Sequence, residues 1–234
     1  MPSDTITSAV DRDSALAVLT TMRRTAFDSA FARLGDYAVA RSVRTEQMTP
    51  SGTTTVIRSY EIRYPPGTER GTIQRRDSSG TFRDGGFFGR VAPERDPAAR
   101  PENVAAQILP DQPAFIEPRT REAFRYALRP ETVRGTPVYV LEATARAYGT
   151  GQDQAVQYAR LHVHRSSRQL IGLTLVRDDE VLLFGEDSRM HLDLQRTTDG
   201  TWVPRESRVR AVLRVPFRTS RHFRTVSSYT IDRR

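Results

Sequence analysis

The chain of 234 residues contains no cysteine. Thiolate metal sites, catalytic thiols and disulfide bonds are therefore excluded. Long apolar runs are also missing, and none approaches the roughly 20 residues that a membrane-spanning helix requires. The opening Met1-Pro2-Ser3-Asp4 has neither the basic start nor the apolar segment of a secretory signal. We therefore expect either a cytosolic protein or a chain that has lost its leader.

Lysine is absent as well, so all 36 basic residues are arginine, and Asn103 is the only asparagine. Lysine and asparagine share AT-rich codons, so their joint depletion indicates a GC-rich genome rather than selection for arginine chemistry. The net charge of +8 raises the question of nucleic acid, but the arginines are interleaved with 28 acidic residues along the whole chain. A solvated, arginine-bearing sheet face is the favoured interpretation, with no nucleic-acid partner. A polyanion-binding surface is the alternative.

Residues 136–231 alternate between apolar and polar side chains over long stretches. Leu161 and Val163, for example, alternate with His162 and His164. A period of two is typical of antiparallel strands with one covered and one solvated face. Strands are predicted at 136–144, 158–164, 169–177, 181–184, 190–195, 201–215 and 221–231, with turns at 178–179 and 198–200. The predicted fold is mainly β (α+β), with one large meandering sheet.

The N-terminal part supplies an amphipathic helix and the first strands. Residues 1–12 are polar and are predicted to form a leader or linker, with a single domain over 13–234. Apolar residues at three- and four-residue steps predict one helix over 15–34 that covers the sheet. Strands follow at 37–43 and 53–64, and then a hairpin of 71–76 with 81–83 around a turn at 77–80.

Residues 84–120 interrupt the strand pattern with three glycines and six prolines. Loops of this length in a compact domain are usually functional or mobile. The stretch also carries apolar side chains, which favours an insertion folded over an apolar surface as a lid: Phe87, Phe88, Ile108, Leu109, Phe115 and Ile116. The β pattern returns from Arg121, and residues 130–135 are expected to connect to the strand at 136.

No stretch predicts a reaction centre. The histidines His162, His164, His191 and His222 fall on predicted strands, but a His-x-His pair on a polar face is more often solvated than bound to a metal. The acids at 178–180 and 186–187 occupy predicted turns, where acids are common. A Gly-x-Ser-x-Gly elbow is missing, and the glycines at 85–89 lack the spacing and lysine of a phosphate-binding loop. We therefore expect no enzyme, no metal and no cofactor.

Three short patches resemble the superfamily of outer-membrane lipoprotein carrier and sorting proteins (LolA-like). Residues 135–142 match its Gly-x-x-x-Tyr-x-Leu strand, 163–171 are similar to its following hairpin, and 199–204 match its Asp-Gly-x-Trp-x-Pro segment. The order of an N-terminal helix, a first hairpin, an irregular excursion and a long antiparallel run also resembles this superfamily over residues 15–231. The chain departs from the pattern in having no visible leader and an arginine-rich strand face.

The resemblance implies a curved, antiparallel half-barrel whose concave face, covered by helices, encloses a cavity for acyl chains without catalysis. The expected location is the periplasm or cell envelope, peripheral to the membrane at most, with lipid or an acylated protein as partner and an envelope protein as a further candidate. On this prediction the covered face and ligand contacts comprise Leu161, Val163, Ile171, Leu173, Leu175, Met190, Leu192, Leu194, Trp202 and Leu213. The alternative from another class is a structural or protein-binding envelope module with a filled core. A cavity of roughly 300 Å³ or more would favour the carrier.

Overall fold

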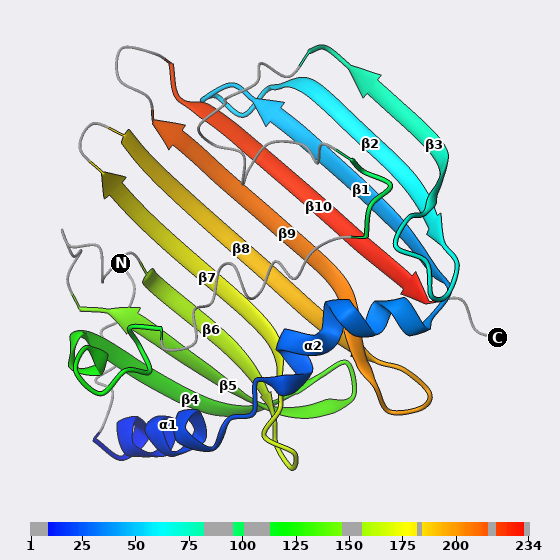
Figure 1. Cartoon of the computed structure of the whole chain (residues 1–234). Helices are drawn as coiled ribbons and strands as arrows, with labels where there is room; N and C mark the ends of the chain where they lie inside the picture. Colours follow the sequence, from blue (N-terminus) through cyan, green and yellow to red (C-terminus); the bar gives the residue numbers. More distant parts are fainter. Residues whose placement is uncertain are drawn as a thin grey trace.

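Ten antiparallel strands form one curved, unclosed sheet (Figure 1). The computed structural model describes residues 9–81, 96–100, 113–146, 156–181, 184–214 and 219–231. The strand order is β3-β2-β1-β10-β9-β8-β7-β6-β5-β4, so β3 and β4 are the two edges. The strands are β1 (Val39–Met48), β2 (Thr54–Tyr64), β3 (Thr72–Ser79), β4 (Phe124–Val133), β5 (Thr136–Ala145), β6 (Val156–His164), β7 (Leu170–Val181), β8 (Phe184–Arg196), β9 (Trp202–Arg214) and β10 (Arg221–Ile231). The predicted mainly-β class is confirmed.

The sheet is a meander in which the first strand of the chain, β1, pairs with the last strand, β10, in the middle of the sheet. Strands β4 to β10 follow one another in space as they do in the chain, and β1 then pairs with β10. Val39 lies opposite Ile231 and Met48 opposite His222, without a shift of register between them. The N-terminal strands β1–β3 thus add to the sheet beyond β10, the last strand of the meander.

The helix predicted over 15–34 is two helices, α1 (Ala9–Thr21) and α2 (Thr25–Arg33). The break falls at Arg23, whose backbone N–H donates to the Arg168 carbonyl at 2.7 Å and whose carbonyl accepts from the Leu170 N–H at 2.8 Å. A residue cannot give these groups to a β-bridge and also to a helix, so the helix is interrupted there. α1 also begins inside the stretch expected to be a leader.

Three further boundary predictions are wrong. The acids at 178–179 and 186–187 do not occupy turns, because β7 and β8 continue through them and pair Asp178 with Asp187. The hairpin expected around 77–80 is also not found, because Asp77 and Ser78 continue β3 and pair with Ser59 and Arg58 of β2. Residues 130–133, expected as a connection, extend β4 to a turn of only Arg134 and Gly135.

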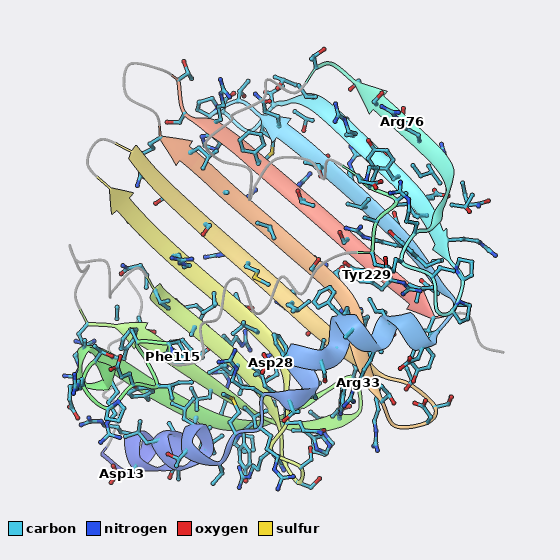
Figure 2. The ribbon with its side chains drawn as sticks, viewed as in Figure 1. Asp13, Asp28, Arg33, Arg76, Phe115 and Tyr229 are labelled. Atoms are coloured by element: carbon cyan, nitrogen blue, oxygen red, sulfur yellow. The ribbon has the colours of Figure 1, made fainter. Side chains whose placement is uncertain are left out.

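The register of the strands assigns each residue to one of two faces. Leu161, Leu173 and Leu192 lie side by side on β6, β7 and β8, and their row continues through Ser207 and Ser227. Two residues beyond Ser227, the Tyr229 ring meets the α2 residue Phe31 edge-on at 6.1 Å (Figure 2). We call this helix-covered side the interior face. The neighbouring row of His162, Gly172, Asp193 and Glu206 therefore lies on the opposite, outer face.

Parts of the stretch predicted as a lid belong to the described residues. Phe115 is fully buried against Phe124, and the Tyr126 hydroxyl donates to its carbonyl at 2.8 Å. The Arg100 guanidinium donates to the Leu34 carbonyl at 2.8 Å. The rest of the stretch lies outside the described residues, including Phe87, Phe88, Ile108, Leu109 and the glycines at 85–89. The prediction that the stretch forms a lid is therefore not tested.

Candidate functional site

The interior face over β6, β7 and β8 carries an aliphatic patch that we define as Leu161, Val163, Leu173, Leu175, Met190 and Leu192. Each of these side chains is at most 3% exposed. The register places Leu161 beside Leu173 and Leu192, and Leu175 beside Met190. Alternation therefore identified a true cluster, because i, i+2 positions share a face of the sheet.

Helices α1 and α2 pack over this part of the sheet. α2 lies against β7 and β9, and α1 against β4 (Figure 1). The covering side chains of α2 include Phe27 and Phe31, at 0% and 5% exposure, and those of α1 include Ala15 and Leu19. Burying a Leu or Phe side chain contributes about 1.5–3 kcal/mol. The contact is a packed sheet–helix interface, held mainly by apolar burial.

Among the other predicted ligand contacts, Ile171, Leu194 and Trp202 belong to the same hydrophobic cluster as the aliphatic patch, and Leu213 does not. Leu213 is 3% exposed and belongs to a separate small cluster with Val56, Ala211 and Phe223, which we call the second cluster. Ile171 lies at a register shift between β6 and β7. Together with Leu194 and Trp202, Ile171 borders a pocket that also contains outer-face residues. The predicted site residues are thus all buried, and they fall into two hydrophobic clusters, with Leu213 in the second.

The interior face becomes more polar from β9 onward. Ser207 and Ser227 continue the leucine row, and the Thr45 and Thr225 hydroxyls are 3.2 Å apart in the next row. Arg41 is only 3% exposed and donates to the Ser227 hydroxyl at 3.2 Å. Its guanidinium also lies 5.7 Å from the centre of the Tyr229 ring, where a cation and an aromatic face attract each other.

Ion pairs cover much of the outer face. Glu46, 3% exposed, lies between Arg44 and Arg224, which donate to it at 2.7 Å each. Burial alone would raise the pKa of Glu46, but the hydrogen bonds and charges of these two arginines outweigh burial and hold the pKa below its ordinary value. Glu142 behaves in the same way: burial opposes the shift, while Arg129 and the Tyr158 hydroxyl lower its pKa. The arginines of this face are therefore engaged with acids of the same sheet.

The outer face holds no metal cluster within the ranges that the structure describes, where no three His, Asp or Glu residues converge as ligands. The nearest approach to catalytic geometry is a chain in which the Thr174 hydroxyl is 2.9 Å from His191 Nδ1 and His191 Nε2 is 3.4 Å from Asp193. Asp193 is already bonded to Arg134 and Arg205 at 2.9 Å each. Because two arginines share this carboxylate at shorter distances than the imidazole does, the chain does not form a nucleophile–base pair.

The grouping of Arg134, Asp193 and Arg205 was missed by sequence reasoning. Arg134 comes from the β4–β5 turn, Asp193 from β8 and Arg205 from β9. Arg134 and Gly135 form a two-residue turn with φ of 49° and 76°, the left-handed pair typical of tight hairpins. The turn could be expected from the glycine, but its contact with Asp193 depends on how the sheet curves.

Comparison with known proteins gives similarity only at the level of solved structures. No protein-family model and no curated protein matches the chain. A DUF1329 family protein from Desulfovibrio piger is similar at 13% identity and a TM-score of 0.34, covering 94% of this chain and 91% of that one. A LolA superfamily protein from Nitrosomonas europaea is similar at 15% identity and a TM-score of 0.26, covering 95% and 92%.

A putative outer membrane lipoprotein-sorting protein domain from Vibrio parahaemolyticus is similar at 10% identity and a TM-score of 0.30, covering 94% of this chain and 93% of that one. Two of these three similar structures carry LolA or lipoprotein-sorting names, the superfamily that the three sequence patches resemble. With TM-scores below 0.5, these likenesses carry no argument about function, which rests on the chain's own residues.

Proposed function

We propose that this protein is a non-enzymatic cell-envelope protein that binds or carries a hydrophobic ligand such as a lipid or the acyl chains of a lipoprotein. The observation that carries the proposal is an apolar interior face that extends beyond its helical cover. Both helices lie near one end of the sheet (Figure 1). The second cluster lies at the opposite ends of its strands, with Leu213 at the end of β9 and Phe223 at the start of β10.

The ligand contacts on this proposal follow from the burial of the predicted residues. Leu213 and the second cluster are the apolar surface outside the helical cover, and because Leu213 is only 3% exposed, an acyl chain contacts it only when neighbouring groups move. The aliphatic patch lies deeper, beneath α2, so it contacts a ligand only when Phe27 and Phe31 move away from it. Ligand sites of this kind are lined mostly by apolar side chains and need few polar groups. No described helix is both long and apolar enough to cross a membrane.

Native mass spectrometry of freshly purified protein tests the proposal, with co-purified lipid as the expected result. A second arm titrates delipidated protein with a dansyl-labelled undecanoic acid. Leu213→Gln is expected to weaken probe binding about tenfold, since it replaces buried apolar surface with an amide. The matched control is Ile73→Gln on edge strand β3, where the side chain is 39% exposed and no change is expected.

A protein that carries no lipid and gives no saturable probe signal would overturn the carrier proposal. The second candidate is then a structural or protein-binding envelope module with a filled core. The specific observation in its favour is the packed interface of α1 and α2 over the aliphatic patch, where Leu161 and Leu192 are fully buried. Circular dichroism of each variant separates lost binding from lost folding.

Nucleic acid is not a proposed partner, because many of the arginines are bonded to acids within the sheet. Arg214, for example, donates to Asp187 at 2.6 Å and to Asp178 at 3.2 Å. Scattered arginines engage few phosphates at once, so binding should be weak and should vanish at moderate salt, with a slope of about −0.9 per phosphate contact. Submicromolar filter binding that persists at physiological salt would contradict this exclusion.

A further inference from the structure

A pocket of about 220 Å³ lies between the β4–β5 turn and the strands β6 to β9. We call it the outer pocket, because the register places His162 and Asp193, which line it, on the outer face. The aliphatic patch faces the opposite side of the sheet. Ile171, Leu194 and Trp202 border the outer pocket, but no residue of the aliphatic patch or of the second cluster lines it.

Gly172 lets the polar residues of the pocket approach one another. A Cβ atom at Gly172 would lie 2.9 Å from His162 Nδ1 and 3.1 Å from Asp193 Oδ1. Because both distances are shorter than a relaxed contact, His162 and Asp193 could not close over this position if it carried a side chain. The glycine thus allows an imidazole and a carboxylate to meet at one point of the outer face.

The charges around the outer pocket do not balance. Arg134, Arg196 and Arg205 line it together with one acid, Asp193. Burial lowers the pKa of His162, so this imidazole is neutral at pH 7 and adds no charge. The lining therefore carries a net charge of +2. Arg196 donates to the Gly200 carbonyl at 3.3 Å, which leaves its positive charge without a carboxylate in the described part of the chain.

Two buried nitrogen atoms of the lining residues are also unsatisfied. Arg205 uses one terminal nitrogen for Asp193, while its Nε has no hydrogen-bond partner among the described residues. The Nε2 atom of His162 is likewise buried and without a partner there. Buried polar groups are nearly always hydrogen-bonded, and each exception calls for an explanation such as a missing ligand. At this pocket the two unsatisfied atoms coincide with the excess of positive charge.

The remaining wall is apolar. Trp202, 6% exposed, and Ile171 line the pocket beside the arginines. The volume is below the roughly 300 Å³ at which drug-sized ligand pockets begin, so the pocket suits a small group rather than a whole lipid. Arginine pairs with planar or tetrahedral oxyanions through two N–H groups at once, which favours carboxylate and phosphate over halide.

We propose that the outer pocket binds a small oxyanion, a carboxylate or a phosphate monoester, whose apolar part lies against Trp202. The oxyanion accepts hydrogen bonds from Arg196 and from the free Nε of Arg205, and its negative charge offsets the excess of +2. The same chemistry is offered by a soluble aryl phosphate or carboxylate and by the headgroup of an anionic lipid.

Intrinsic fluorescence tests the inference directly, since Trp202 is the only tryptophan of the chain. The full chain is titrated with phenyl phosphate, benzoate and inorganic phosphate, and in parallel with vesicles of phosphatidylglycerol or of phosphatidylcholine. We expect a saturable change in Trp202 emission with phenyl phosphate, or with phosphatidylglycerol vesicles only. The first result assigns the pocket to a soluble anion and the second to a lipid headgroup.

Substitutions decide whether the arginines are responsible. Arg196→Gln is expected to weaken binding at least tenfold without a loss of stability, because it gives up only a bond to a backbone carbonyl. Arg205→Gln should weaken binding as well, and its folding is checked by circular dichroism because it also loses Asp193. The matched control is Arg208→Gln, on the same strand but paired with Glu206 and not part of the lining.

Three outcomes overturn the proposal. One is no change in Trp202 emission with any probe. Another is equal binding to both kinds of vesicle with no response to soluble anions, which shows that charge plays no part. The third is a signal that Arg196→Gln and Arg205→Gln leave as strong as in the unmodified protein. The dansyl acid is itself a carboxylate, so its titration is repeated in Arg196→Gln and in Leu213→Gln. Weaker binding in Arg196→Gln alone assigns the probe to the outer pocket, and weaker binding in Leu213→Gln alone assigns it to the second cluster, so this inference and the proposed function fail independently.

Discussion

The sheet has two halves that use the same interior face in different ways. In the first half, strands β4 to β8, the central row is Leu141, Leu161, Leu173 and Leu192; α1 lies against β4, and α2 reaches from β7 to β9 at the start of the second half. In the second half, strands β9, β10 and β1 to β3, the same row continues as Ser207, Ser227, Val43 and Tyr60. The second half ends at β3, whose residues are all exposed and whose Arg76 lies 5.8 Å from the Tyr60 ring (Figure 2).

The difference indicates a division of tasks within one sheet. Aliphatic side chains against aromatic helix residues interlock closely, so the first half fixes the fold and tolerates little change of volume. Rows of serine and threonine with a small apolar cluster pack less closely. We therefore expect a change of side-chain contacts in the second half to lower the free energy of unfolding less than in the first half. The charged, exposed edge strand β3 also discourages pairing with another chain.

The largest expected loss of stability comes from replacing a buried leucine by alanine, and the same substitution can be made in each half. Leu161→Ala, in the aliphatic patch, should lower the free energy of unfolding by about 3–5 kcal/mol, because the cavity is surrounded by packed side chains. Leu213→Ala, in the second cluster of four residues, should cost about 2–3 kcal/mol. Urea unfolding measures both variants. Equal losses would show that the two halves are packed alike.

The next effect concerns one buried carboxylate from each half. Asp193→Asn should cost about 1–3 kcal/mol, since it weakens charge-assisted bonds from two arginines and releases the β4–β5 turn. Glu46→Gln should lower the free energy of unfolding by less, because Glu46 binds only Arg44 on its own strand and Arg224 on the adjacent strand and holds no turn in place. Thermal unfolding at pH 7 ranks the two variants.

The effect of pH on stability can be predicted for Asp193 from the direction of its pKa shift. Burial would raise the pKa of Asp193, but hydrogen bonds from His191, Arg205 and Arg134 outweigh it and hold the pKa well below the ordinary value of 3.8. A lowered pKa stabilises the fold above the unfolded value and loses that contribution as pH falls below it. Unfolding midpoints between pH 5 and 2 should therefore fall less steeply in Asp193→Asn. An unchanged slope would contradict the ion pair.

A smaller effect tests how the first half is sealed by the segment around Phe115. The Tyr126 hydroxyl donates to the carbonyls of Phe115 and Arg121, so Tyr126→Phe should cost about 0.5–1.5 kcal/mol. Burial raises the pKa of Tyr126 from 10.0 to about 12. The folded phenol thus keeps its proton while the unfolded one ionises, and stability is lost as pH rises from 10 to 12. This part of the alkaline loss should disappear in Tyr126→Phe.

The smallest effect is expected for the polar rows of the second half. The double substitution Thr45→Val and Thr225→Val replaces both partners of one hydrogen bond by groups of similar shape, which is close to neutral, within about 0.5 kcal/mol. On the proposed function, the added apolar surface should tighten binding of the dansyl acid. A loss above 2 kcal/mol would show that the second half depends on its polar contacts for stability.

Local patterns account for much of the secondary structure. The strands at 136–144, 158–164 and 221–231 were predicted nearly at their observed bounds. The alternation of apolar and polar side chains that predicts a strand involves only neighbouring residues, so it can be recognised from the sequence. The errors have non-local causes. The acids at 178 and 187 stay in strands because Arg214, from β9, donates to both and offsets their repulsion. The helix breaks at Arg23 because its backbone pairs with the β6–β7 turn.

The candidate sites divide in the same way. Alternation alone found the aliphatic patch, since one face of a strand is specified by every second residue. The separation of Leu213 from the cluster of that patch depends on the order of the strands in the sheet, which no local pattern records.

The sequence by itself determined a mainly-β chain with apolar helices, no thiol chemistry and one consistently apolar strand face, because composition and period act over a few residues. Only the tertiary structure decided which strands join, where the helices lie and that Arg134 reaches Asp193 across the outer face. Those features depend on the curvature of the whole sheet, which brings together residues far apart in the chain.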